Sequence, residues 1–168
     1  MEFKFKIRGL VNSFRYAGKG IRYCLRCERN FRIHIVMALF VSAFSLFYDF
    51  TAAEKCILAL TFGMVMTAEV FNTAIEYVVD HISQAYSVYA KVIKDVSAGA
   101  VLLSALSAIA VGIILFADKT ALLSIIVFFM EKPYMIAVLA LDIVVSLLFI
   151  FYGTGSGNRM KKRGKIND

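Results

Sequence analysis

Acidic and amide side chains recur along one apolar stretch of the sequence, EVFNTAIEYVVD at positions 69–80. A carboxylate near the centre of a bilayer costs about 2.5–3.5 kcal/mol on insertion scales, so two of them in one membrane helix need a polar environment. At about 100° of rotation per residue, the polar members fall on one side of a helix, and the rise along them is roughly 16 Å. These members, which we call the acid stripe, are Glu69, Asn72, Thr73, Glu76 and Asp80.

The acid stripe suits a site that takes a lipid hydroxyl from the bilayer and a charged nucleotide from the cytosol. Carboxylates can accept a proton from a hydroxyl, and their hard oxygens are ligands that Mg²⁺ prefers. Two other interpretations stay open. The stripe could be a polar seam that only fixes helix packing, or it could line a proton or ion path. Two acids and an amide cost more free energy in hydrocarbon than helix packing alone requires, which favours the binding site.

Two further groups flank the stripe. Lys94 and Asp95 open the next apolar stretch, where a cation and a carboxylate could meet phosphate and metal, although such pairs often only snorkel at helix ends. Glu28 lies among arginines in RCERNFRIH, and is either a salt-bridge partner or a further Mg²⁺ ligand. The sequence has no GxxxxGK[ST] phosphate loop and no protein-kinase signature, so a nucleotide site must be built from several helices.

The composition predicts that these residues are carried by membrane helices. The 168-residue chain is 60% hydrophobic with a mean hydropathy of +0.74, which is too apolar for an ordinary soluble domain. With one proline, and with apolar stretches near the ~18 residues that signal a spanning helix, it is predicted to be an all-α polytopic bundle. The predicted spans are residues 31–48, 56–79, 96–116 and 134–152.

The segments outside the spans have distinct patterns. Residues 2–22 place apolar side chains on one helical face and basic ones largely elsewhere, which predicts an amphipathic surface helix on the cytoplasmic leaflet. Residues 80–94 are predicted to be a polar connection, and residues 122–130 an interfacial segment too short to cross. The third span is rich in small residues, Ser97 among them, which indicates close helix packing.

The net charge of +7 is concentrated near the two ends of the chain. Residues 1–32 hold nine lysines and arginines, and the tail after Gly153 holds five more. Basic segments favour the cytoplasmic side, so we expect both termini inside and four spans rather than three. Charge beside apolar spans reports topology and contact with anionic lipid, so no nucleic-acid partner is expected. Cys24 and Cys27 lack a second pair for zinc and are predicted to be free thiols.

The stretch at 69–80 resembles the signature of the prokaryotic diacylglycerol kinase family, E-x-x-N-[ST]-A-x-E-x-x-V-D. Every defining position of that signature matches this sequence. The resemblance covers about residues 5–117, and its other matching positions are Tyr16, Lys19 and Gly20, then Glu28, Phe31 and Arg32, and finally Lys94 and Asp95.

This resemblance implies an ATP-dependent lipid kinase in a bacterial cytoplasmic (inner) membrane, with its active site at the cytoplasmic face. It implies a homotrimer of three-span subunits with a surface helix, and active sites shared between neighbouring subunits. The roles it implies are as follows: Glu69 as general base, Glu28 and Glu76 as ligands of Mg²⁺ on ATP, Tyr16, Tyr86, Lys94 and Asp95 as nucleotide contacts, and Asn72 and Asp80 as supporting residues.

The segment from Glu28 to His34 resembles undecaprenol kinases of Gram-positive bacteria more than diacylglycerol kinases of enteric bacteria. Undecaprenol is therefore the expected acceptor, with diacylglycerol as the alternative. A non-enzymatic ion or proton conductor, or a packing subunit, is the competing class.

The fourth span departs from the family pattern and carries a further costly acid, Asp142, which could pair with a neighbouring helix or face the bundle. We therefore divide the chain into a lipid kinase membrane domain at 1–118, an interfacial segment with an extra span at 119–152, and a basic cytoplasmic tail at 153–168.

Overall fold

The computed structural model describes residues 2–82 and 87–152, with side chains from residue 9 onward. Every element in these ranges is helical, which confirms the predicted all-α class. In chain order the elements are α1 (Glu2–Cys27), α2 (Arg29–Phe44), the short 3₁₀ helix η1 (Ser45–Phe47), α3 (Ala52–Ile82), α4 (Val88–Leu115), α5 (Lys119–Glu131) and α6 (Tyr134–Tyr152).

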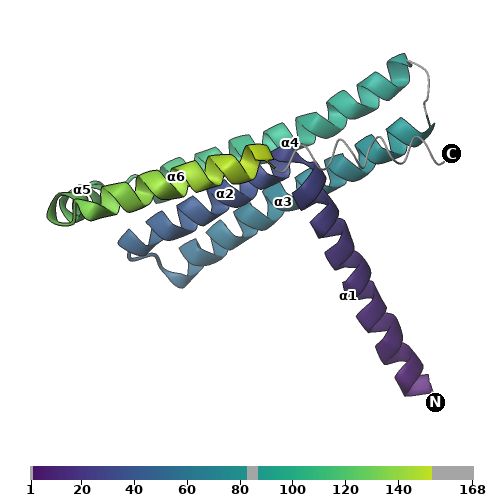
Figure 1. The fold of residues 1–168 in the computed structure, drawn as a ribbon, viewed down its shortest axis with the longest axis horizontal. Helices are drawn as coiled ribbons and strands as arrows, with labels where there is room; N and C mark the ends of the chain where they lie inside the picture. The colour runs from purple at the N-terminus through teal and green to yellow at the C-terminus, as the bar shows by residue number, and fades with distance from the viewer. Residues whose placement is uncertain (1, 83–86, 153–168) are drawn as a thin grey trace.

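Four of these elements are long and apolar enough to cross a membrane, namely α2 with η1, α3, α4 and α6. They lie along one another in a bundle, with α5 at one end (Figure 1). The most apolar parts of α4 and α6 bury almost none of their residues inside the protein, so their side chains face outward. An apolar outer surface of this extent fits contact with lipid or with other membrane helices. The predicted polytopic bundle is confirmed.

The prediction that residues 80–94 form a polar connection is wrong in its length, because both ends of this range are helical. Helix α3 continues to Ile82 and α4 already begins at Val88. The polar residues that suggested a loop lie instead on the ends of two helices that are longer than the apolar spans they contain. Hydropathy marks where a chain leaves hydrocarbon, and a helix can continue past that level. Tyr86 and the tail at 153–168 lie outside the described residues.

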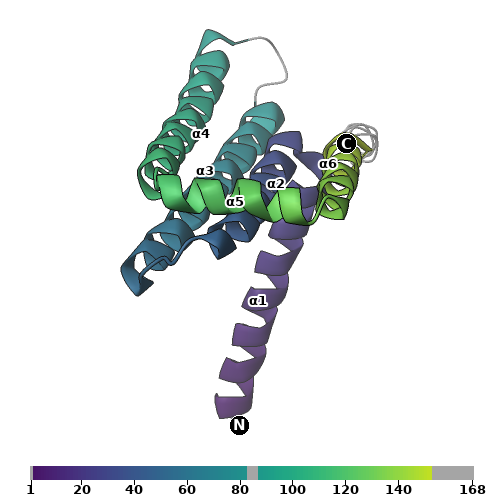
Figure 2. The ribbon, with the colours of Figure 1, turned by 90° about the vertical axis from the view of Figure 1, so that its left-hand side faces the viewer.

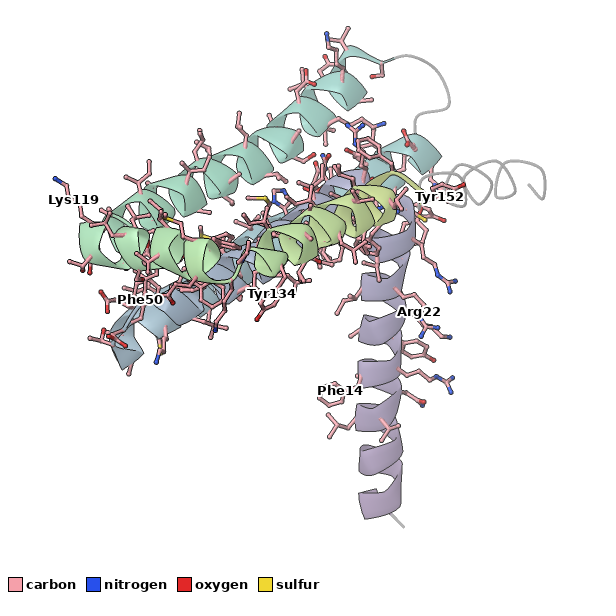
Figure 3. The ribbon with its side chains drawn as sticks, turned by 60° about the vertical axis from the view of Figure 1, so that its left-hand side comes forward. Phe14, Arg22, Phe50, Lys119, Tyr134 and Tyr152 are labelled. Atoms are coloured by element: carbon pink, nitrogen blue, oxygen red, sulfur yellow. The ribbon has the colours of Figure 1, made fainter. Side chains whose placement is uncertain are left out.

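Helix α1 stands away from the bundle at the corner where α2 begins (Figure 1). Its side chains divide by polarity. Figure 3 shows Phe14 on the side of α1 toward which the bundle extends, and Arg22 on the opposite side. Leu10, Val11 and Phe14 are all exposed in the single chain. Separate apolar and basic faces are the pattern of a helix that lies at a membrane surface, and this location of α1 stays a prediction.

The far end of the bundle is closed by aromatic packing. Helix α5 has only 13 residues, and it crosses between the ends of α4 and α6 (Figure 2). It packs through Ala121 on a buried cluster that contains Tyr48 and Phe50. The Asp118 side chain caps α5 by accepting hydrogen bonds from the Thr120 hydroxyl at 2.6 Å and from the Thr120 backbone N–H at 2.8 Å, which lower the pKa of Asp118. A helix of this length does not span, as the sequence predicted.

Candidate functional site

The acid stripe runs down α3 from the protein interior to the surface. Glu69, Asn72 and Thr73 are buried, Glu76 is half-buried, and Asp80 at the end of the stripe is exposed. This gradient is the one expected from the helical spacing, with the deepest carboxylate first. The stripe is therefore one continuous polar face, enclosed at one end and open at the other.

Glu69 is the most enclosed acid, with 2% of its surface exposed. Glu28 and Glu76 act on its carboxylate electrostatically, and the Asn30 side chain forms a hydrogen bond with it. One carboxylate oxygen, Oε2, is buried and has no hydrogen-bond partner within the described part of the chain. An unsatisfied buried acceptor is costly and uncommon in folded proteins, so it needs an explanation. Glu69 Oε2 is placed to accept a hydrogen bond or a proton from a group that enters the site.

Asn72 links the acids to α4. Its Nδ2 donates to Glu76 Oε1 at 3.1 Å, and its Oδ1 accepts from Ser97 Oγ at 2.7 Å. Because both ends of the amide are engaged, the Asn72 side chain has one preferred orientation. That orientation fixes one oxygen of Glu76 and leaves the rest of its carboxylate available to a ligand.

A cation lies beside the exposed end of the stripe. Lys94 Nζ on α4 lies 2.5 Å from Asp80 Oδ1 on α3. Both side chains are at least one third exposed, so this ion pair adds little to stability. It does place a positive charge at the exposed end of the stripe, where a phosphate group could exchange with Asp80. Asp95, the next residue, is exposed on α4.

Glu28 forms the corner between α1 and α2. It is the only residue that separates the two helices, and its backbone is extended, with φ −106° and ψ 118°. Its N–H donates to the Cys24 carbonyl at 2.8 Å, whereas its carboxylate does not cap α2. The Glu28 carboxylate is therefore not used for capping α2, and it acts electrostatically on the buried Glu69.

Tyr16 lies apart from these groups. It is exposed on the projecting part of α1, with Lys19 Nζ 5.7 Å from the centre of its ring. At 1.5 Å per residue it stands roughly 16 Å along α1 from the corner. The single chain brings Glu28, Glu69, Asn72 and Glu76 together and does not bring Tyr16 to them.

The donor set of the site is made of carboxylate and amide oxygens. Such hard ligands fit Mg²⁺, which binds few carboxylates and keeps places for phosphate oxygens and water. In the described ranges, however, no group of three or more acidic, histidine or cysteine side chains could hold a metal ion. A metal bound here would therefore depend on one or two carboxylates of this chain, together with oxygens from a nucleotide.

Sequence reasoning missed the contacts of three polar side chains on the helices beside α3. Asn30 reaches Glu69 from the first turn of α2, and Ser97, which had been assigned to helix packing for its small size, holds Asn72. Arg32 is buried with 1% of its surface exposed. The spacing within one helix cannot reveal these residues, because each acts on another helix.

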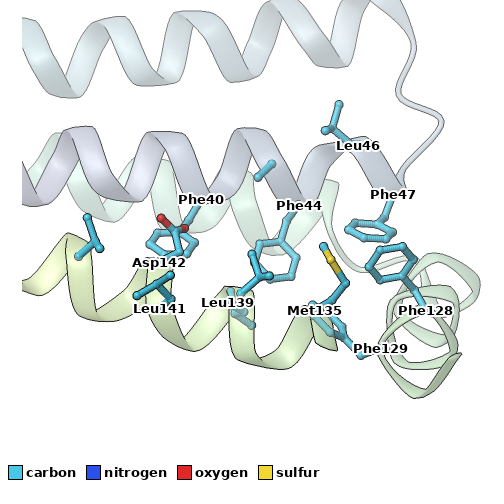
Figure 4. Close-up of a pocket in the computed structure, with 13 residues that line it drawn as sticks. Phe40, Phe44, Leu46, Phe47, Phe128, Phe129, Met135, Leu139, Leu141 and Asp142 are labelled. Atoms are coloured by element: carbon cyan, nitrogen blue, oxygen red, sulfur yellow. The ribbon is translucent and has the colours of Figure 1, made fainter. Parts of the chain in front are cut away.

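Asp142 lies in a different place. It lines an apolar groove of about 590 Å³ between α2, α5 and α6 (Figure 4), with Phe40 and Leu139 among its neighbours. No residue of the acid stripe lines this groove. The fourth span therefore does not bring its acid to the site on α3.

Known proteins resemble the central part of this chain. A family model described as prokaryotic diacylglycerol kinase matches residues 15–116. A diacylglycerol kinase of Synechocystis is 44% identical over 100 residues, which is 59% of this chain and 57% of that protein. An undecaprenol kinase of Bacillus subtilis is 36% identical over 60% of this chain and 82% of its own length. A diacylglycerol kinase of Escherichia coli is 30% identical over 59% and 81%, respectively.

Proposed function

The chain belongs to the prokaryotic diacylglycerol kinase family, a family of membrane lipid kinases, and we propose that it transfers the γ-phosphoryl group of ATP to the hydroxyl of a membrane lipid. The observation that carries this proposal is the buried Glu69 Oε2, which has no hydrogen-bond partner among the described residues, on a carboxylate that interacts with Glu28, Glu76 and Asn30. A non-enzymatic conductor or packing subunit gains no support from the related proteins, all of which are named as kinases.

Glu69 is the general base in this proposal. Its free oxygen accepts the proton of the lipid hydroxyl while the hydroxyl oxygen attacks the γ-phosphorus of ATP. The bond between that phosphorus and the bridging oxygen breaks, and ADP leaves. Positioning and charge stabilisation supply most of the catalysis in phosphoryl transfer, so a fixed base in an enclosed site is the main requirement.

Glu28 and Glu76 would hold Mg²⁺ in this proposal, and the bound ion would supply positive charge that neutralises the ATP phosphates. Asn72 supports the site by fixing one oxygen of Glu76. Asp80 supports it by holding Lys94 in place at the exposed end of the stripe.

The nucleotide-binding residues are Lys94 and Asp95 on α4, with Tyr16 and Tyr86 as further contacts. Because Tyr16 stands far from the acids of its own chain, it would reach ATP most directly in the site of a neighbouring subunit. This separation supports sites shared between subunits, and the resemblance to the family makes a homotrimer the assembly that we propose. The basic terminal segments support a location in the bacterial cytoplasmic membrane with the site facing the cytosol.

Undecaprenol is the acceptor we propose first. The Glu28–His34 segment favours it, because this segment resembles that of undecaprenol kinases. Diacylglycerol is the second candidate, because the Synechocystis diacylglycerol kinase shares 44% identity with this chain against 36% for the Bacillus undecaprenol kinase.

The test is a transfer assay with purified full-length protein in detergent, Mg²⁺ and ATP labelled at the γ-phosphate. Undecaprenol and diacylglycerol are offered separately and then together at equal mole fraction. Label in undecaprenyl phosphate, with little in phosphatidic acid, supports the first acceptor, and the reverse supports the second. Hydrolysis or transfer that does not depend on added lipid would contradict the lipid kinase assignment.

A further inference from the structure

One arginine joins the fourth span to the corner that carries Glu28. Arg32 Nε donates to the backbone carbonyl of Ile150 on α6 at 3.1 Å, across 118 residues of sequence. Its Nη1 donates to the carbonyls of Leu25 and Arg26 on α1 at 3.2 and 3.3 Å. One guanidinium in the first turns of α2 thus joins α2 to both α1 and α6.

All three acceptors are of the same kind. The last four carbonyls of a helix have no partner within it and carry a partial negative charge, which a cation stabilises. Leu25 and Arg26 belong to the last turn of α1, and Ile150 belongs to the last turn of α6. Arg32 therefore caps the C-terminal end of α1 and also binds the Ile150 carbonyl of α6, which the fixed fork of a guanidinium allows.

The contact with Ile150 is hard to replace. Arg32 is buried, and its Nη2 has no hydrogen-bond partner in the described ranges. Glu28 also acts on the guanidinium electrostatically. Loss of the Ile150 carbonyl would leave a second donor of a buried cation unsatisfied, and the guanidinium would then move toward other acceptors. The nearest elements it could pull with it are the end of α1 and the Glu28 corner.

From these contacts we propose that α6 is a positioning element for the kinase site. Its Ile150 carbonyl holds Arg32, Arg32 holds the end of α1, and the end of α1 sets the direction of the Glu28 carboxylate. The proposal rests on the proposed function, and it assigns a role to a helix that lies beyond the family match at residues 15–116. Arg32 is a positioning residue in this account, since it acts on the site through Glu28.

The test moves one carbonyl in the full-length protein. A proline at position 151 disfavours the helical conformation of the residue before it, so Phe151→Pro swings the Ile150 carbonyl away from Arg32. Phe151→Leu is the matched control, because it keeps the backbone hydrogen bonds and an apolar side chain. The readouts are the Mg²⁺ concentration for half-maximal transfer, KM for the lipid, and the oligomer size in detergent.

We expect Phe151→Pro to raise the half-maximal Mg²⁺ concentration about tenfold, the equivalent of one charge-assisted hydrogen bond. KM for the lipid and the oligomer size should match those of Phe151→Leu. Arg32→Lys should also raise the half-maximal Mg²⁺ concentration. Because both substitutions act through one contact, the variant that combines Phe151→Pro with Arg32→Lys should need little more Mg²⁺ than either single variant. If the wild type is active and the Mg²⁺ titration curves of Phe151→Pro and Phe151→Leu coincide, the positioning role of α6 is wrong. The proposed function is not affected by that result. An inactive wild type would instead overturn the proposed function.

Discussion

Ser97 Oγ on α4 donates a hydrogen bond to Asn72 Oδ1 on α3 at 2.7 Å, and both side chains are buried. Through Asn72 Nδ2 this contact continues to Glu76 Oε1. A small residue of a packing helix thereby determines how an acid on the neighbouring helix is oriented. The close approach of α3 and α4 serves the site as well as the fold.

Replacing Ser97 by alanine should lower kcat about five- to tenfold. The change removes a hydrogen bond and leaves the buried Asn72 carbonyl oxygen unpaired, which is a loss of about 1–1.4 kcal/mol. Ser104→Ala is the matched control on the same helix, because the Ser104 hydroxyl bonds only to the Ala100 carbonyl of its own helix. The measurement is phosphate transfer under saturating lipid and ATP, and equal rates for the two variants would contradict the role of Ser97.

Replacing Glu76 by glutamine should raise the Mg²⁺ requirement sharply. The amide keeps the size of the side chain and can still bond Asn72, but it removes the negative charge that a metal ion prefers. Glu131→Gln, an exposed acid at the end of α5, provides the comparison. Activity is titrated with Mg²⁺ at fixed ATP, and a curve for Glu76→Gln that overlays the wild type would remove Glu76 as a metal ligand.

The four-span topology predicts that the C-terminal tail lies in the cytosol. A cysteine at position 156, placed in a variant in which the three native cysteines are serine, should stay unlabelled by a membrane-impermeant maleimide in intact cells. A cysteine at position 49, in the short connection between α2 and α3, should be labelled readily. Labelling of the tail position before lysis would favour three spans and would place the tail outside.

The sequence alone was sufficient to predict the features that depend on the residue pattern of a single helix. The helical spacing of Glu69, Asn72 and Glu76 places them on a common face, and the cost of acids in hydrocarbon predicts that this face is functional. The hydropathy pattern gave four spans, including the extra helix that ends at Tyr152. It misjudged the connection after Asp80, because helices continue beyond the apolar part of a span.

Features that depend on two helices could not be predicted in this way. Neither the contact of Asn30 with Glu69 nor that of Ser97 with Asn72 follows from the spacing of either helix. The hydrogen bond from Arg32 to the Ile150 carbonyl links residues 118 apart in the sequence. Its acceptor is a backbone carbonyl, which every residue type has, so the identity of residue 150 does not reveal it. These contacts require the packing of the bundle to be known.

The most direct test of the whole account is the transfer rate of Glu69→Gln, compared with Glu54→Gln at the other end of α3. Glu54 is a carboxylate on the same helix that accepts hydrogen bonds from Thr51, far from the site. With folded, correctly sized oligomers in both cases, lipid phosphorylation should be abolished in Glu69→Gln and unchanged in Glu54→Gln. Normal lipid phosphorylation by Glu69→Gln would show that the buried acid of α3 is not the base, and the proposed mechanism would be wrong.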